Sequence, residues 1–107
     1  MARYMVIGEM TGQGVQGLFD QGFASRHAQF VEMIGEQGGT VEGYWFNEQG
    51  QSVVQWRQDG PWNRTVAKLM TIASGAWHVV QTMELFDADE LDAQLGATPG
   101  YQAPGRS

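Results

Sequence analysis

The stretch TVEGYWFNEQGQSVVQWRQ, residues 40–58, predicts a β-hairpin in the middle of the chain. Two runs rich in β-branched and aromatic residues, 40–47 and 52–58, flank a short polar loop that contains Gly50, which is the pattern of two antiparallel strands joined by a turn. Alternation places Tyr44 and Phe46 on one face and Trp45 on the other. Large aromatic residues on both faces predict that neither face is fully exposed to water.

A strand and a helix are expected on each side of this hairpin. A strand over residues 3–10 and a helix over residues 15–36 precede it, the helix carrying apolar residues spaced by three and four. Gly22 costs about 1 kcal/mol relative to alanine inside that helix, so a break is compatible with the pattern there. A helix over residues 62–74, which Asp59 and Pro61 are expected to start, and a strand over residues 77–86 follow.

The C-terminal part predicts one more short element. Asp87 followed by Glu90 resembles a capping box for a helix over residues 87–95. Residues 96–107 show no periodicity and are expected to form a flexible tail. The chain is therefore interpreted as one domain, residues 1–95, with a tail of residues 96–107.

The order strand, helix, strand, strand, helix, strand predicts an α+β fold. It is the order of a ferredoxin-like βαββαβ sandwich, in which a four-stranded antiparallel sheet carries both helices on one face. The other face then needs a cover, and a second copy of the chain is the simplest one. We expect a homodimer in which two sheets pair as a dimeric α/β barrel; a monomer with an exposed, aromatic-rich sheet is the alternative.

The composition disfavours several classes of partner. Twelve acidic residues face six basic ones, giving a net charge of −6, whereas nucleic acids and anionic membrane surfaces attract clustered positive charge. The chain has no cysteine, which removes disulfides and thiolate chemistry. No signal peptide and no apolar run of about 20 residues are recognised, so a cytoplasmic location is expected.

Several short motifs together resemble a known family. The chain resembles GYD-domain proteins, small bacterial proteins of the dimeric α/β-barrel superfamily, over about residues 2–91, through Tyr4-x-Val6, Thr11-x-Gln13-Gly14, Arg26, Gly38-Gly39, Tyr44-Trp45, Val53-Val54 and Thr82-Met83-x-Leu85-Phe86. Where many relatives carry Gly-Tyr-Asp, this chain has Gly50-Gln51-Ser52. The resemblance implies the barrel fold and a dimer, and it implies no particular reaction.

One glycine-rich motif and the two histidines bear on whether the chain binds a cofactor or a metal. Residues 12–17 match G-x-G-x-x-G after a strand, but the next strand returns in a hairpin instead of continuing a dinucleotide-binding βαβ unit. A strand-to-helix turn is the preferred interpretation. His27 and His78 show no H-x-x-x-H, H-x-H or E-x-x-H pairing, so neither a metal nor another cofactor is expected.

The candidate site is a pocket between the sheet and the helices. Its expected walls combine rings with a few polar groups: Tyr4, Tyr44, Phe46, Gln55 and Thr82. His78 or His27 is the candidate general base, although a histidine on an apolar helix stripe, as His27 is, more often belongs to a core or interface.

Two functions follow from this sequence. The first is a homodimer that binds a small, aromatic or apolar molecule, with cofactor-independent oxygenase or isomerase activity as an extension if a histidine removes a proton from the substrate. The second is a non-enzymatic structural or regulatory homodimer whose aromatic residues serve only the interface. An enclosed cavity of about 300 Å³ or more with a histidine on its wall would favour the first, and a fully packed barrel interior would favour the second.

Overall fold

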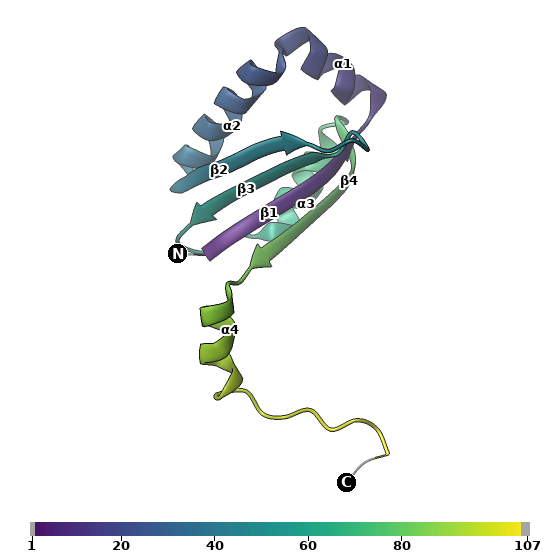
Figure 1. Cartoon of the computed structure of the whole chain (residues 1–107). Coiled ribbons are helices and arrows are strands. Elements are labelled where there is room, and N and C mark those ends of the chain that lie inside the picture. The colour runs from purple at the N-terminus through teal and green to yellow at the C-terminus, as the bar shows by residue number, and fades with distance from the viewer. Residues whose placement is uncertain (1, 106–107) are drawn as a thin grey trace.

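The computed structural model describes residues 2–105 and contains one sheet of four antiparallel strands in the order β2-β3-β1-β4 (Figure 1). The elements are β1 (Ala2–Met10), α1 (Gly12–Gln21), α2 (Phe23–Glu36), β2 (Gly39–Phe46), β3 (Ser52–Gln58), α3 (Arg64–Ala73), β4 (Trp77–Leu85) and α4 (Ala88–Leu95). The predicted α+β class and the four-stranded antiparallel sheet are confirmed.

The helices α2 and α3 lie over the two edge strands of the sheet. α2 packs on β2 and α3 packs on β4, whereas β3 and β1 form the centre of the sheet. We call the side that these helices cover the inner face, and the opposite side the outer face. Each helix thus stands over an edge of the sheet, and the central strands lie between α2 and α3.

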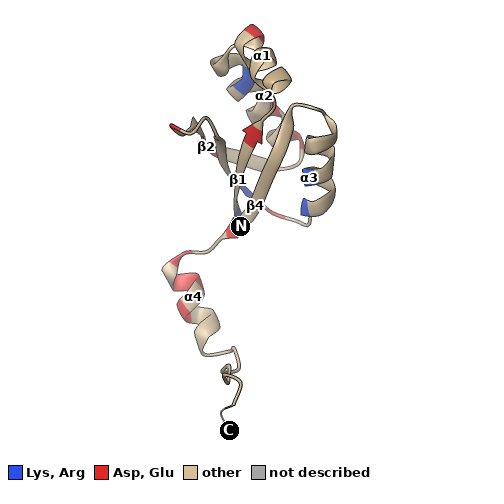
Figure 2. Cartoon of the chain, turned by 90° about the vertical axis from the view of Figure 1, so that its right-hand side faces the viewer, with Lys and Arg blue, Asp and Glu red and all other residues tan. Residues whose placement is uncertain are grey.

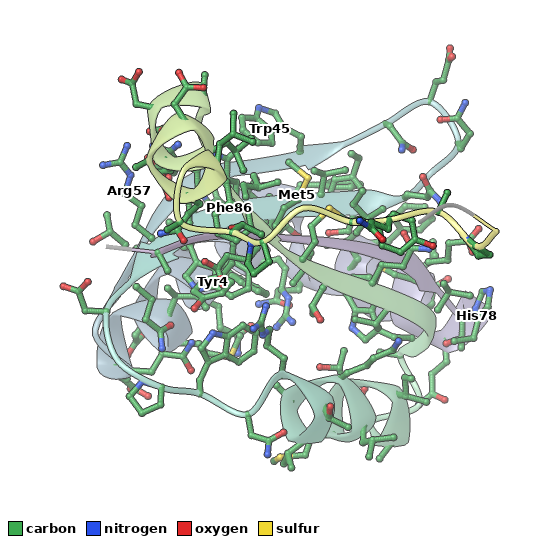
Figure 3. The ribbon with its side chains drawn as sticks, turned by 90° about the horizontal axis from the view of Figure 1, so that it is seen from below. Tyr4, Met5, Trp45, Arg57, His78 and Phe86 are labelled. Carbon is green, nitrogen blue, oxygen red and sulfur yellow. The ribbon has the colours of Figure 1, made fainter. Side chains whose placement is uncertain are left out.

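The inner face carries the hydrophobic core. Tyr4 lies opposite Trp56 in the register of β1 and β3, and these two side chains are buried together with Val54 and with Ile34 of α2. Trp62, just before α3, adds a third ring to the cluster, 5.3 Å from Tyr4 and 5.5 Å from Trp56 between ring centroids. Figure 3 shows Tyr4 on the α3 side of the sheet and Met5 and Trp45 on the other side.

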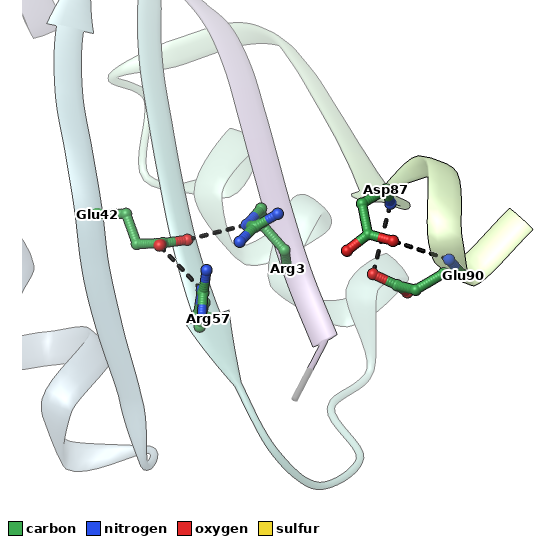
Figure 4. A network of polar contacts seen from close by, with 5 residues as sticks. All are labelled: Arg3, Glu42, Arg57, Asp87 and Glu90. Atoms are coloured by element: carbon green, nitrogen blue, oxygen red, sulfur yellow. Dashed lines mark hydrogen bonds and ion pairs between the residues drawn. The ribbon is translucent and has the colours of Figure 1, made fainter.

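A β-bulge in β2 allows two of its apolar residues, three positions apart, to face the same core. The pairing of β2 with β3 shifts between Val41 and Gly43, so Val41 and Tyr44 both face inward although they are three residues apart. The extra residue, Glu42, points outward and accepts from Arg3 Nε at 3.2 Å, and it pairs with Arg57 Nε at 2.9 Å (Figure 4). The bulge thus places a carboxylate between two arginines on the outer face.

The first helical segment begins earlier than predicted and is broken where a break was allowed. Gly22 has a φ of 92°, a conformation that glycine adopts without strain, and it separates α1 from α2. The predicted start at residue 15 is wrong by three residues, because the Thr11 side chain accepts from the backbone N–H of Gly14 and caps a helix that starts at Gly12.

The start of α3 also differs from the prediction. Asp59 and Pro61 lie outside the helix, and Asn63 is its cap, since Asn63 Oδ1 accepts from the backbone N–H of Val66 at 2.9 Å. Trp62, predicted as the first helical residue, packs in the core instead. The helix therefore begins only after this ring has been buried.

The last helix projects from the body of the protein. The predicted capping box is confirmed: the Asp87 side chain accepts from the backbone N–H of Glu90, and the Glu90 side chain accepts from that of Asp87 (Figure 4). α4 and residues 96–105 extend away from the sheet in Figure 1, and the radius of gyration is 17.3 Å, against about 13 Å for a compact chain of this length.

Two glycines of α1 provide a test of this packing. A Cβ on Gly14 would meet the backbone carbonyl of Ala76, whereas a Cβ on Gly17 would meet open space. We expect Gly14→Ala to lower the free energy of unfolding by about 1–3 kcal/mol, and Gly17→Ala to raise it by about 0.5–1 kcal/mol through helix propensity. Urea unfolding followed by tryptophan fluorescence measures both, and equal effects of the two substitutions would contradict the close approach of α1 to Ala76.

Candidate functional site

A cavity of about 480 Å³ lies between α2, α3 and the inner face of the sheet. This volume falls within the range of about 300–1,000 Å³ that is usual for small-molecule sites. Its floor comes from the central strands and β4, through Val6, Val54, Trp56 and Val80. The cavity is thus the open space that remains between two helices standing over opposite sheet edges.

Most of the cavity wall is apolar. α2 contributes Phe30, Met33 and Ile34, and α3 contributes Ala67 and Met70. Trp62 and Trp77 complete the wall from the segments that flank α3. Flat rings and flexible methionine side chains make a surface that suits aromatic or apolar ligands.

A smaller number of polar side chains lie in the same wall. They come from both helices and from the sheet: Arg26, Gln37, Tyr44, Ser52, Lys68, Thr71, Ser74 and Thr82. In addition, Nε1 of Trp62 is buried and has no hydrogen-bond partner within residues 2–105. An unpaired buried donor is costly, but this nitrogen is covered by protein atoms and offers no surface to a ligand in the cavity.

Tyr44 is the titratable group whose environment is most informative. Its ring stacks on His27 with 5.1 Å between centroids and 8° between planes, and it contacts Phe46 edge-on at 5.6 Å. Burial raises the pKa of the Tyr44 phenol above 10.0, and the nearby charge of Arg26 opposes this rise. The phenol is therefore neutral at physiological pH and is able to donate a hydrogen bond rather than act as a base.

The structure brings some of the predicted site residues together. Tyr44 and Thr82 line the cavity. Tyr4 lies in the core cluster next to the wall residues Trp56 and Trp62, and Phe46 packs against Tyr44. His27 lies against the Tyr44 ring but is itself exposed and is not part of the wall.

Gln55 and His78 lie elsewhere. Gln55 pairs with Met5 on β1, so it belongs to the outer face. His78 is exposed near the start of β4, where the pairing with β1 shifts between Glu9 and Met10. Trp77, not His78, lines the cavity, because this irregularity breaks the alternation from which His78 was expected on the same face as Thr82.

Arg26 and Lys68 are wall residues that the sequence analysis did not select. A usable signal exists for Arg26, which stands four residues before Phe30 and eight before Ile34 and so shares their helix side. Lys68 is the only lysine of the chain, but its helix side is less clear because α3 buries no residue fully. The position of Lys68 at the cavity depends on how α3 packs on β4.

Within residues 2–105, no group of three or more histidine, aspartate or glutamate side chains is arranged to hold a metal ion. None of the helices in this range is long and apolar enough to cross a membrane.

Comparison with known proteins finds no matching family model, no matching curated protein and no matching solved structure. The resemblance to GYD-domain proteins therefore stays a prediction, and the function has to be argued from the cavity itself.

The charge of Arg26 at the Tyr44 ring can be tested by titration. Arg26→Gln should raise the pKa of Tyr44 further, because burial remains while the opposing charge is lost. The phenolate absorbance of each protein, minus that of the same protein with Tyr44→Phe, isolates the titration of Tyr44.

The same shift makes the stability of the fold depend on pH. Because the pKa of Tyr44 is higher in the folded state than in the unfolded state, the contribution of Tyr44 to stability is present at neutral pH and is lost as the pH rises above 10.0.

Arg64→Gln is the matched control, since Arg64 lies over the Tyr4 ring, 5.5 Å from its centroid, and not in the cavity wall. It should leave the Tyr44 titration unchanged. A Tyr44 pKa that falls in Arg26→Gln would show that the two groups are arranged differently.

Proposed function

We propose that this chain is a binding protein that takes a small, aromatic or apolar molecule into the cavity between α2, α3 and the inner face of the sheet. The observation that carries the proposal is the cavity of about 480 Å³, whose wall is mainly apolar and contains several aromatic rings. Ligand sites typically combine such walls with a few polar groups that fix orientation. Tyr44 and Thr82 are the polar groups proposed for this role.

The proposal includes the ferredoxin-like, dimeric α/β-barrel class. The strand order β2-β3-β1-β4 and the placement of α2 and α3 over one face support it, because a βαββαβ chain with right-handed crossovers arranges its strands in this way. In such a sandwich, the space between the helices and the sheet is available for a ligand.

Binding is favoured over base catalysis by a histidine. Among the described residues that line the cavity there is no histidine, and a general base must lie within hydrogen-bond reach of the proton it removes. Tyr44 is at the wall, but its raised pKa keeps it protonated. An oxygenase or isomerase activity would therefore need a base from the ligand or from a rearranged His27.

A steric block gives a direct test of the binding site. Ala67 lines the cavity from α3, whereas Ala73 is exposed on the same helix and outside the wall. We expect 2-naphthamide, a neutral two-ring probe, to bind the unmodified chain in a calorimetric titration. Ala67→Trp should weaken this binding at least about tenfold, equivalent to about 1.4 kcal/mol, and Ala73→Trp should not change it.

Circular dichroism of both variants verifies that the fold is retained. Failure of 2-naphthamide to bind the unmodified chain, or the same affinity in Ala67→Trp as in Ala73→Trp, would refute this cavity as the site.

We also propose that two copies of the chain associate through the outer face. This face carries apolar side chains that are only partly covered: Met5, Ile7, Trp45, Val53, Met83 and Leu85. Trp45 is 52% exposed, and a contiguous apolar surface of this kind is typical of an interface. A second copy is the proposed partner because apolar side chains from all four strands of this face can match their copies in a two-fold dimer.

The projecting α4 supports association as well. Phe86, Leu91 and Leu95 are 55%, 56% and 76% exposed, although aliphatic and aromatic residues of this size usually lie in a core. The chain is small and would gain from burying this surface. An arm of this kind would find apolar contacts on a neighbouring copy rather than on its own sheet.

The dimer can be tested by a charge placed in the outer face. Sedimentation or light scattering at micromolar concentration should give twice the chain mass of 11.8 kDa. Met83→Glu should yield the monomer mass, because a buried carboxylate without a partner destabilises the interface. Leu69→Glu, the matched change at an exposed position of α3, should remain dimeric. A monomer in the unmodified chain would contradict the proposal.

A further inference from the structure

The charges of the cavity wall differ from those of the whole chain. The chain has twelve acidic and six basic residues, yet the described residues of the wall include Arg26 and Lys68 and no aspartate or glutamate. In a protein with a net charge of −6, this is the reverse of the average surface. Figure 2 shows positively charged positions on both α2 and α3.

The same two cations have no ion pair within the described residues. Arg3 and Arg57 pair with Glu42, and Arg64 lies 3.9 Å from Glu84. For Arg26 and Lys68, no carboxylate within residues 2–105 lies at ion-pair distance. Among the basic residues of the described range 2–105, the two without a carboxylate at ion-pair distance are thus the two that belong to the cavity wall.

The position of Arg26 is fixed by neutral groups. Its Nη1 donates to Gln29 Oε1 at 2.9 Å, and its guanidinium carbon lies 5.9 Å from the centroid of the Phe30 ring. These contacts hold the side chain in place without neutralising its charge. The effect of Arg26 on the Tyr44 phenol indicates that this charge acts on the cavity wall.

We infer that the ligand of this cavity is an aromatic or apolar molecule that carries one carboxylate, held by Arg26 from α2 and by Lys68 from α3. The inference rests on the proposed function and specifies the class of ligand. The guanidinium group matches a carboxylate with two parallel donors, and Tyr44, whose hydroxyl is neutral, belongs to the same wall. The apolar remainder of the wall accommodates the body of the molecule, so a small inorganic anion alone would leave most of the cavity unfilled.

A matched pair of probes separates the charge from the ring system. We would titrate the full chain by calorimetry at low ionic strength with 2-naphthoate and with 2-naphthamide, which differ in the carboxylate. The expected preference for 2-naphthoate is about tenfold, with about threefold from each partly exposed cation. The preference should decrease as salt is added, because ions screen exposed charges.

Variants then assign the preference to the two residues. Arg26→Gln and Lys68→Gln should each weaken 2-naphthoate binding about threefold and leave 2-naphthamide binding unchanged, and the double variant should bind both probes equally. Arg64→Gln removes the same unit of charge outside the wall and should keep the full preference. Circular dichroism verifies the fold of each variant.

The remaining outcomes overturn the inference in distinguishable ways. Equal binding of both probes to the unmodified chain would overturn the carboxylate while the aromatic site stands. A preference that survives in the double variant would remove Arg26 and Lys68 as its source. Failure of both probes to bind would refute the proposed function, and the inference with it.

Discussion

The rings of Tyr4, Trp56 and Trp62 contact one another above the two central strands, and the arrangement of the helices depends on this packing. Tyr4 and Trp56 are neighbours across β1 and β3, and Trp62 reaches them from the segment that precedes α3. Such aromatic contacts contribute about 0.5–1.5 kcal/mol each beyond their burial. The cluster holds the start of α3 against the sheet while the rest of the helix lies over β4, which leaves room between α3 and α2.

Hydrogen bonds to Gln58 connect this aromatic cluster to the end of α2. Trp56 Nε1 donates to Gln58 Oε1 at 3.2 Å, and Gln37, at the end of α2, donates to the same oxygen at 2.8 Å. Gln58 is buried, so these bonds offset the cost of placing an amide in the core. The floor of the cavity and the end of α2 are therefore fixed by the same residues, and the width of the cavity is a property of the fold.

Local patterns in the sequence were sufficient for most of the fold. The hairpin over β2 and β3 and the capping box at Asp87 each follow from a few neighbouring residues, and the structure contains both. One helix was expected over residues 15–36, and Gly22, where the pattern allowed a break, divides it into two. The assignment of side chains to faces was less secure where alternation is interrupted. The extra residue at Glu42 and the irregular pairing near His78 each change the side on which residues lie.

The candidate site was harder to predict than the fold for a related reason. Alternation along β3 places Gln55 and Trp56 on opposite faces of the sheet. It does not show which face the helices cover when both faces carry large apolar residues. Only the contacts of Ile34 and Trp62 with Trp56 decide this. Arg26 and Lys68 come from helices far apart in the chain, so their shared position at one cavity follows from tertiary packing alone.

Because α4 projects from the body of the protein, we expect it to unfold locally without the rest of the chain. An eight-residue helix is shorter than the length at which helices persist alone in water, and its capping box and acidic first turn stabilise mainly its N-terminal end. Its amide hydrogens should therefore exchange with solvent through fraying of the helix itself, independently of the slow global opening that exposes the sheet. Protection of these amides would then depend on whatever packs against Leu91 and Leu95, which makes α4 an internal reporter of assembly that is separate from the stability of the core.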